Sequence, residues 1–173
     1  MTDAFSASVQ SWQGFYAAVA QATAALLGLL FVAVSIRLAN VTAGERLEQR
    51  GRVATVFSNL VTALILSLLM LIPDQSAGSI AAQIGIVALV SAVRVVRRSW
   101  QLMNARPRHR IEFATWRRLG WTVFAIGMLG YTAAGLWLNG GAGYLYALLA
   151  AVFIFLIGAA DVSWELLLQE PGH

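Results

Sequence analysis

Residues 15–36 read FYAAVAQATAALLGLLFVAVSI, a run without a single charged side chain. A helix of about 20 apolar residues is long enough to cross the hydrocarbon core of a bilayer. Four further apolar stretches of similar length follow, at residues 53–72, 79–96, 119–138 and 144–162. The sequence therefore predicts an all-α polytopic membrane bundle of about five transmembrane helices, in which residues 1–173 form a single transmembrane domain.

The composition agrees with a membrane protein. Hydrophobic residues make up 59% of the chain and charged residues 12%, whereas soluble domains are about 45–50% apolar and about 25% charged. The absence of cysteine excludes disulfides, thiolate metal sites and thiol catalysis, and no cofactor or metal is expected. Asp3 and the long uncharged run that follows it do not fit a cleavable signal peptide.

The positive charges predict the topology. All twelve basic residues are arginine, four between Arg37 and Arg52 and eight between Arg94 and Arg118. Because arginine is enriched in cytoplasmic loops, we expect both clusters inside, the N-terminus outside and the C-terminus in the cytoplasm of a multi-pass plasma-membrane protein. Since orientation explains the clusters, the net charge of +4 is not a signal for nucleic-acid binding.

Several local signals mark the predicted helix ends. Thr42–Glu45 has the pattern of a capping box before the second span, Pro73 ends that span, and Ser76 is a candidate N-cap for the third. The segment Asn139–Gly143 predicts a tight turn between the last two spans. Aromatic residues predict interfacial belts. The outer belt comprises Trp12, Phe15, Tyr16, Trp137, Tyr144 and Tyr146, and the inner belt Trp100, Trp116, Trp121 and Trp164.

The loop Arg97–Arg118 is the largest piece outside the predicted spans. Its segment Arg108–Arg118 could form a short helix that binds anionic lipid through its arginines. The alternative is that these arginines only enforce orientation.

Small residues recur at spacings of three and four along several spans. Such rows let helices approach closely, so we expect the first span to be buried against protein and the other rows to pack within the bundle. The rows are Gly14, Ala18, Gln21, Ala25, Gly28, Val32 and Ser35 in the first span, Gly78, Ala82, Gly85 and Ala92 in the third, Gly120, Gly127, Gly130 and Ala134 in the fourth, and Ala147, Ala151 and Gly158 in the fifth.

Polar side chains within the spans are candidate pore-lining or interhelical residues. Serine and threonine can bond to their own helix, whereas Gln21, Asn59 and Gln83 need partners elsewhere. Hydrogen bonds between helices and a water-filled path are both open explanations. The candidates are Gln21, Gly28, Ser35, Thr55, Ser58, Asn59, Thr62 and Gln83.

A charged cluster is predicted at the inner membrane edge. Arg94, Arg97 and Arg98 lie on one face of the third helix, and Asp161 lies near the inner end of the fifth. We predict that Asp161 pairs with Arg94 or Arg97 because a charge at this depth needs a partner or water. The pair would act either as a clamp between two spans or as part of an arginine ring around a pore or anion site.

Sequence features of other function classes are missing. No acidic residue, lysine or histidine lies in the middle of a span, which argues against a proton-coupled pump. Neither a phosphate-binding loop nor a nucleophile elbow nor a pair of catalytic carboxylates is present, so we do not expect an enzyme.

Two stretches resemble a family of small bacterial membrane proteins. They are residues 25–38, ALLGLLFVAVSIRL, and residues 71–76, LIPDQS. Members are sometimes labelled modulators of the FtsH protease. The resemblance implies the bacterial inner membrane and points to Gly28, Ser35 and Gln75. More loosely, the first span is similar to the pore helix of Orai-type calcium channels, although it lacks an acidic residue at the outer mouth.

Three functions fit these patterns. One is a homo-oligomeric ion channel with its pore on the symmetry axis, lined by the first or the third span. Another is a non-conducting modulator or partner subunit of another membrane protein, and the third is a lipid-binding protein acting through Arg108–Arg118. The direction in which Gln21 and Gln83 point should separate them.

Overall fold

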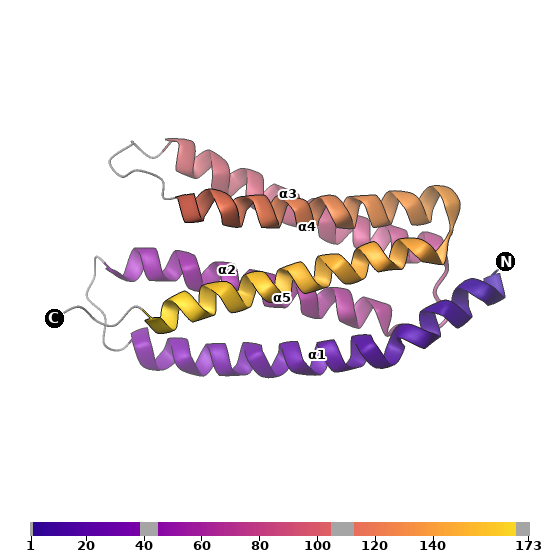
Figure 1. The fold of residues 1–173 in the computed structure, drawn as a ribbon, viewed down its shortest axis with the longest axis horizontal. Helices are drawn as coiled ribbons and strands as arrows, with labels where there is room; N and C mark the ends of the chain where they lie inside the picture. The colour runs from indigo at the N-terminus through magenta and orange to yellow at the C-terminus, as the bar shows by residue number, and fades with distance from the viewer. Residues whose placement is uncertain (1, 39–44, 105–112, 169–173) are drawn as a thin grey trace. The chain divides into compact units, whose positions relative to one another are not determined.

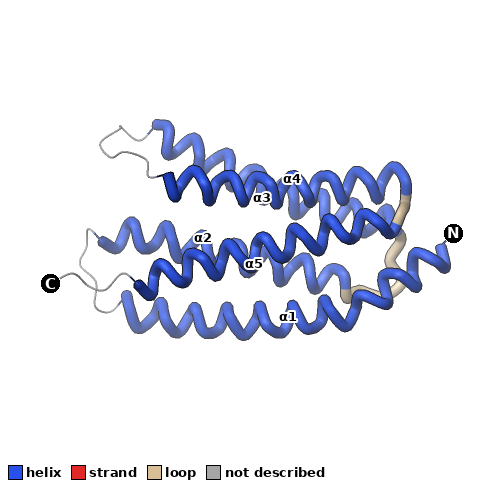
Figure 2. Tube along the Cα trace, viewed as in Figure 1, coloured by secondary structure: helices blue, strands red, loops and turns tan. Residues whose placement is uncertain are grey.

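The computed structural model describes residues 2–38, 45–104 and 113–168, and every regular element in these ranges is a helix (Figure 1, Figure 2). The predicted all-α architecture is therefore confirmed. The elements are α1 (Thr2–Leu38), α2 (Glu45–Met70), α3 (Ala77–Asn104), α4 (Phe113–Asn139), the short 3-10 helix η1 (Ala142–Tyr144) and α5 (Leu145–Leu168).

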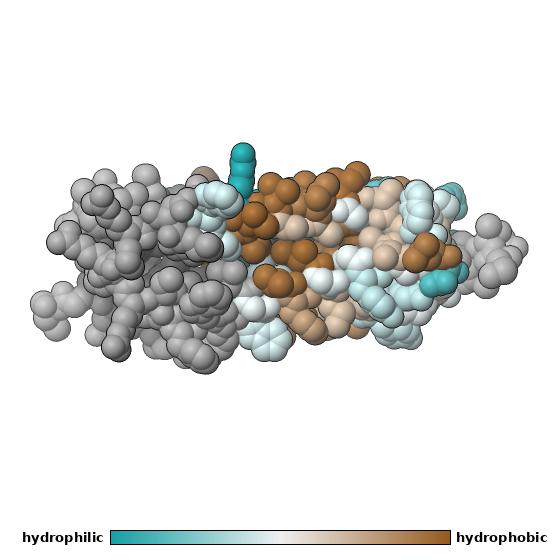
Figure 3. Space-filling model, turned by 90° about the horizontal axis from the view of Figure 1, so that it is seen from above, coloured by the Kyte–Doolittle hydropathy of each residue, from teal (hydrophilic) through white to brown (hydrophobic). Residues whose placement is uncertain are grey.

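Five helices are long and apolar enough to cross a membrane, as the sequence predicted. Their apolar segments are Ala7–Ser35, Val53–Met70, Ala77–Arg97, Gly120–Asn139 and Ala142–Asp161. The face drawn in Figure 3 carries a broad area of hydrophobic residues. Large side chains such as Leu29, Phe31 and Ile86 are exposed, which suits lipid better than water. These features fit a multi-pass membrane protein.

The start of α3 confirms the predicted N-cap. The backbone N–H of Ser79 donates to Oγ of Ser76 over 3.2 Å, which satisfies one of the free donors at this helix end. The preceding helix α2 ends at Met70, three residues before Pro73. It begins at Glu45, well before the apolar segment, while the capping-box residues Thr42–Gly44 lie outside the described residues.

The tight turn predicted at Asn139–Gly143 is also confirmed. Gly140 has a φ of 61°, a left-handed conformation that glycine adopts without a steric penalty. Its N–H donates to the carbonyl oxygen of Leu136 over 3.0 Å and so closes the end of α4. The chain then passes through η1 directly into α5.

The chain divides into two compact units. Unit 1 comprises Met1–Ser11 and Ile72–Ile154, and unit 2 comprises Trp12–Leu71 and Phe155–His173. Unit 1 thus holds α3, α4 and the first part of α5, and unit 2 holds most of α1, all of α2 and the last part of α5.

In unit 1, α3 and α4 pack against each other (Figure 1). Gly85 of the predicted third-span row lies at this contact, since a Cβ on it would stand 3.9 Å from Cβ of Ala133. The buried side chains of the unit are Val9 of α1, Ile80, Ala81, Ile84, Ala88 and Ser91 of α3, Ala125, Leu129, Thr132 and Leu136 of α4, and Leu145, Leu148, Ala151 and Val152 of α5.

In unit 2, the cluster Val56, Leu60 and Ala159 joins α2 to the end of α5, and Leu27 and Leu30 of α1 pack against it. Tyr16 is 1% exposed and belongs to the buried residues of this unit. Its assignment to an interfacial belt was therefore wrong, because its ring packs inside and makes an edge contact with Phe15 at 5.2 Å between centroids. Trp137, Tyr146, Trp100 and Trp121 are exposed, as belt residues should be.

The loop before α3 contains a strained residue. Asp74 has a φ of 53°, a left-handed conformation that costs most L-residues about 1–2 kcal/mol and that aspartate tolerates better than most. We expect Asp74→Gly to leave the thermal midpoint unchanged or to raise it slightly. Asp74→Val should lower the stability by about 1–2 kcal/mol, because a β-branched side chain fits this conformation poorly. Thermal unfolding of the detergent-solubilised variants measures both effects. An Asp74→Val protein with the same midpoint as Asp74→Gly would contradict the prediction.

Candidate functional site

The most distinctive surface of unit 2 is a row of small and polar residues on α1, here called the α1 row. Its members are Gly14, Ala18, Gln21, Ala25, Gly28, Val32 and Ser35, and all of them are exposed. Gly14 and Gly28 would have nothing within 4 Å of an added Cβ. The α1 row is therefore an open surface along the helix.

The α1 row is long enough to cross the hydrocarbon core of a bilayer. The 21 steps from Gly14 to Ser35 correspond to roughly 32 Å of helix, compared with roughly 30 Å for a hydrocarbon core. Its spacing alternates strictly between four and three, a mean period of 3.5 residues. That period keeps one face of a helix against a parallel neighbour in a left-handed supercoil.

The predicted burial of the first span against protein is not provided by the single chain, and burial against another copy or another protein stays a prediction. The apolar segment of α1 is only 11% buried, the lowest value of the five. The side of α1 that faces its own unit carries Tyr16, Ala20, Thr23, Leu27 and Leu30, of which the first three are buried and the last two half-buried.

Gln21 is the polar centre of the α1 row. It stands midway along the segment Ala7–Ser35 and is exposed. Within the described residues the structure gives its side chain no hydrogen-bond partner. An amide without a hydrogen bond costs about 2–7 kcal/mol in an apolar medium. Gln21 at this depth therefore requires water or a second protein surface.

The hydroxyl groups behave as predicted and bond to their own helices. Ser35 Oγ donates to the carbonyl oxygen of Phe31 over 2.8 Å, and Thr62 Oγ1 donates to that of Ser58 over 2.8 Å. Buried Thr23 does the same with Val19 over 2.6 Å. These bonds remove the need for a partner on another helix.

Asn59 lies against α5 within unit 2. A Cβ on Gly158 would stand 3.3 Å from Nδ2 of Asn59, so the absence of a side chain at Gly158 makes room for this amide. Both residues are half-buried. The contact places Asn59 beside α5 within one unit, which agrees with an interhelical position.

Gln83 on α3 is the second unusual amide. Its Oε1 atom is buried and, within the described part of the chain, accepts no hydrogen bond. A buried acceptor left unsatisfied costs about 1–3 kcal/mol, and such atoms in native proteins are often satisfied by water. Unlike Gln21, its oxygen is enclosed and does not face outward.

This enclosed oxygen gives a prediction for Gln83→Met. Methionine has a similar volume and no polar atom that must be desolvated, so we expect stability to stay equal or to rise by about 1 kcal/mol. Thermal unfolding of the purified variant measures this, with Gln21→Met as the exposed counterpart. A clear loss of stability in Gln83→Met would mean that Gln83 has a bonded partner, such as an internal water molecule.

The predicted charged cluster draws its members from both units of the chain. Arg94 and Arg97 are exposed side chains of unit 1, and Asp161 is an exposed side chain of unit 2. The pairing of Asp161 with either arginine therefore stays a prediction. The side chain of Arg98 and the segment Arg108–Arg118 lie outside what the structure describes, as do the side chains of Trp116 and Trp164.

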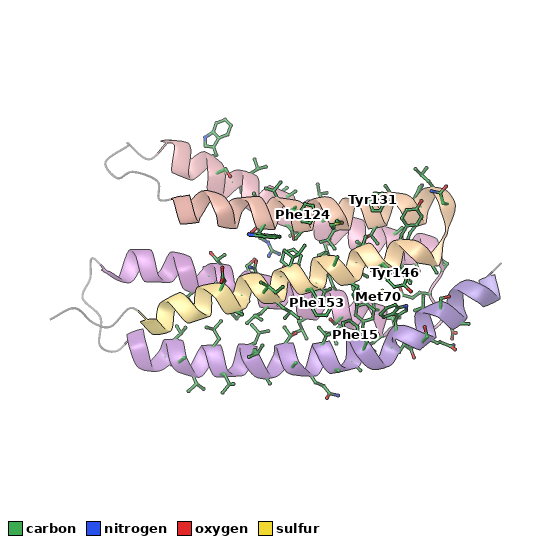
Figure 4. The ribbon with its side chains drawn as sticks, viewed as in Figure 1. Phe15, Met70, Phe124, Tyr131, Tyr146 and Phe153 are labelled. Carbon is green, nitrogen blue, oxygen red and sulfur yellow. The ribbon has the colours of Figure 1, made fainter. Side chains whose placement is uncertain are left out.

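The row on α4 is open as well, contrary to its predicted packing within the bundle. Gly120, Gly127 and Gly130 are exposed with nothing within 4 Å of an added Cβ, and Ala134 is exposed. Phe124 and Tyr131, two other exposed residues of α4, are labelled in Figure 4. The α4 row lacks an amide or a charged group, so it places no polar demand on the bilayer.

Sequence reasoning missed the glycine of α4 that does pack. Gly135 is buried, and a Cβ on it would overlap the ring of Tyr144. Tyr144 is held by a hydrogen bond of 2.8 Å from Nδ2 of Asn139 to its Oη and by an edge contact of 5.4 Å with Tyr131. Tyr144, which follows the glycine-rich turn, could have indicated that a large ring packs back against α4. In the sequence it was assigned only to the outer aromatic belt.

Among the described residues, no three histidine, cysteine, aspartate or glutamate side chains come together as a metal site would require. No protein-family model matches the sequence, and no curated protein and no solved structure is similar enough to count as a match.

Proposed function

We propose that this protein is an oligomeric ion channel of the bacterial inner membrane, with its pore on the symmetry axis and the α1 row of each copy facing that axis. The observation that carries the proposal is the outward direction of Gln21, at the middle of an open row that is as long as the bilayer is thick. The arginine clusters favour an N-terminus outside and a C-terminus in the cytoplasm.

An identical helix is a suitable partner for the α1 row. The period of 3.5 residues repeats along the whole row, so a second copy in parallel presents the same residues at the same depths. A glutamine amide both donates and accepts hydrogen bonds, so it is complementary to the same amide on another copy. The row thus satisfies its own polar demand by association.

Several copies around an axis would enclose a path and not merely a contact. Glycine, alanine and serine side chains project little toward the axis, and the described part of the row, Gly14–Ser35, carries no charged residue. Water in such a lumen would satisfy Gln21 and the backbone around the glycines. With only two copies, the small residues would instead allow close helix contact and exclude water.

Ion flux from purified protein in liposomes tests this function. We expect potassium and chloride gradients to dissipate faster than in empty liposomes, and Gln21→Ala to change the rate. Arg94→Ala, on α3 of unit 1, should leave the rate unchanged if α1 lines the path. A change with Arg94→Ala alone would move the pore to α3, and no flux under any gradient or membrane potential would exclude a channel.

The open row on α4 favours a second candidate function, a non-conducting modulator or partner subunit of another membrane protein. Gly127, Gly130 and Ala134 would let a foreign helix approach closely. The resemblance of residues 25–38 and 71–76 to proteins labelled as protease modulators would fit this function. Absence of flux, together with a co-purifying membrane protein that is lost in Gly127→Phe, would favour it.

We propose no enzymatic activity, and binding of anionic lipid by Arg108–Arg118 remains a prediction.

A further inference from the structure

Gln21 differs from every other member of the α1 row in reach. The remaining members are glycine, alanine, valine and serine, and the Ser35 hydroxyl is turned back to its own helix. The amide of Gln21 stands at the end of a longer side chain than any of these. In a bundle of α1 helices it therefore projects farthest toward the axis and sets the narrowest point.

We propose that the Gln21 side chains of the copies around the axis form a ring of neutral amides that passes small monovalent ions of either sign and rejects divalent cations. This inference rests on the channel function proposed above. It names the residue that determines selectivity and the class of ion that passes.

The chemistry of the amide supports a weak preference for the sign of the charge. Its carbonyl oxygen can face a cation and its NH2 group can face an anion, and rotation of the side chain exchanges them. Channels that select strongly for cations or anions use rings of carboxylates or basic side chains instead. No charged residue occurs between Ala7 and Ser35, so no other part of the segment supplies such a ring.

The same neutrality disfavours divalent cations. Ions such as Ca²⁺ and Mg²⁺ bind several oxygen ligands, commonly including carboxylates, and Mg²⁺ gives up its water reluctantly. A ring of amides offers oxygen without negative charge. Monovalent ions lose less on partial dehydration, so they should pass where divalent cations do not.

The absence of cysteine from the chain allows a direct test with single-cysteine variants. Gln21→Cys places a thiol in the ring, and Ala22→Cys is the matched control at the same depth, about 100° around the helix. Both proteins are assembled in planar bilayers and then treated with a thiol reagent that carries either a sulfonate or a trimethylammonium group. Because the charge is added after assembly, folding is not at issue.

For the unsubstituted protein we expect similar permeabilities for K⁺ and Cl⁻ and no measurable current carried by Ca²⁺. The sulfonate reagent on Gln21→Cys should raise the permeability ratio of K⁺ to Cl⁻ by about fivefold or more, which is the effect of one unit charge about 4 Å from an ion in water. The trimethylammonium reagent should lower this ratio in Gln21→Cys. Neither reagent should change the permeability ratio of Ala22→Cys.

Each contrary result has one meaning. A conducting protein whose selectivity is unchanged in treated Gln21→Cys, or changed equally in Ala22→Cys, would overturn the Gln21 ring while the channel function stands. Passage of Ca²⁺ at a rate similar to K⁺ would also overturn it. An unsubstituted protein that does not conduct would overturn the channel function, and the ring with it.

Discussion

Gly135→Ala is expected to destabilise unit 1 by about 1–3 kcal/mol or more, the usual cost of an extra methyl group in a packed interior. The new Cβ would overlap the Tyr144 ring, and that ring cannot easily move away. Asn139 donates a hydrogen bond to Oη of Tyr144, and Thr132 Oγ1 donates to the backbone carbonyl of Tyr144 over 3.4 Å. The ring of Tyr131 makes an edge contact with the Tyr144 ring, with 5.4 Å between the ring centroids. Thermal unfolding in detergent, followed by circular dichroism, measures the loss.

Gly130→Ala is the matched control for this experiment. Gly130 lies on the same helix, is exposed, and has nothing within 4 Å of an added Cβ. Alanine there should be neutral or should stabilise the helix by up to about 1 kcal/mol. Adding Tyr144→Ala to Gly135→Ala should recover part of the loss, since the two residues are in contact. A Gly135→Ala protein that unfolds like the unsubstituted one would show that Tyr144 has another position available.

Gly28→Phe is expected to abolish ion flux while leaving the fold of the single chain intact. Gly28 is exposed and a Cβ on it would have nothing within 4 Å, so a larger side chain can point outward from its own unit. On the proposed axis, the same substitution in every copy would fill the lumen or push the helices apart. Liposome flux measures conduction, and circular dichroism and size-exclusion chromatography show whether the protein is still folded and assembled.

Gly127→Phe is the control for Gly28→Phe. It also replaces an exposed glycine within an apolar helix, but on α4 and not on α1. We expect normal flux from this variant. Unchanged flux in Gly28→Phe would exclude the α1 row as the lining of the path, and a loss of flux confined to Gly127→Phe would point to the α4 row.

The sequence was sufficient to predict where the helices lie along the chain, but not which face of each helix packs within the chain. Ser76 and the segment Asn139–Gly143 predicted a cap and a turn correctly because these signals are local and involve few residues. Small-residue rows show only where another helix can approach. They do not show whether that helix belongs to the same chain, so Gly85 was placed correctly and the glycines of the row on α4 were not.

For the same reason, the sequence predicted which amides need partners but not the environment of each amide. Composition and spacing identified Gln21, Asn59 and Gln83 as amides that need partners, because no residue on their own helix can satisfy them fully. Their different environments depend on packing. Asn59 lies against Gly158, the Oε1 atom of Gln83 is buried, and Gln21 faces outward. Tyr16 was misassigned because an aromatic ring near a span end fits a helix interior as well as an interface.

The hydrogen bonds of Thr23, Thr62, Ser67 and Thr132 to carbonyl oxygens one turn earlier bear on how the protein is made. Each of these hydroxyls is satisfied before its helix meets any other, so they present no obstacle when a newly synthesised segment enters the bilayer alone. The amide of Gln21 has no such bond to its own helix, so it needs water or a second protein surface. Biogenesis would thus proceed from independent insertion to packing within the chain, and the outward amide of Gln21 would be the last polar group to be satisfied, when finished copies meet.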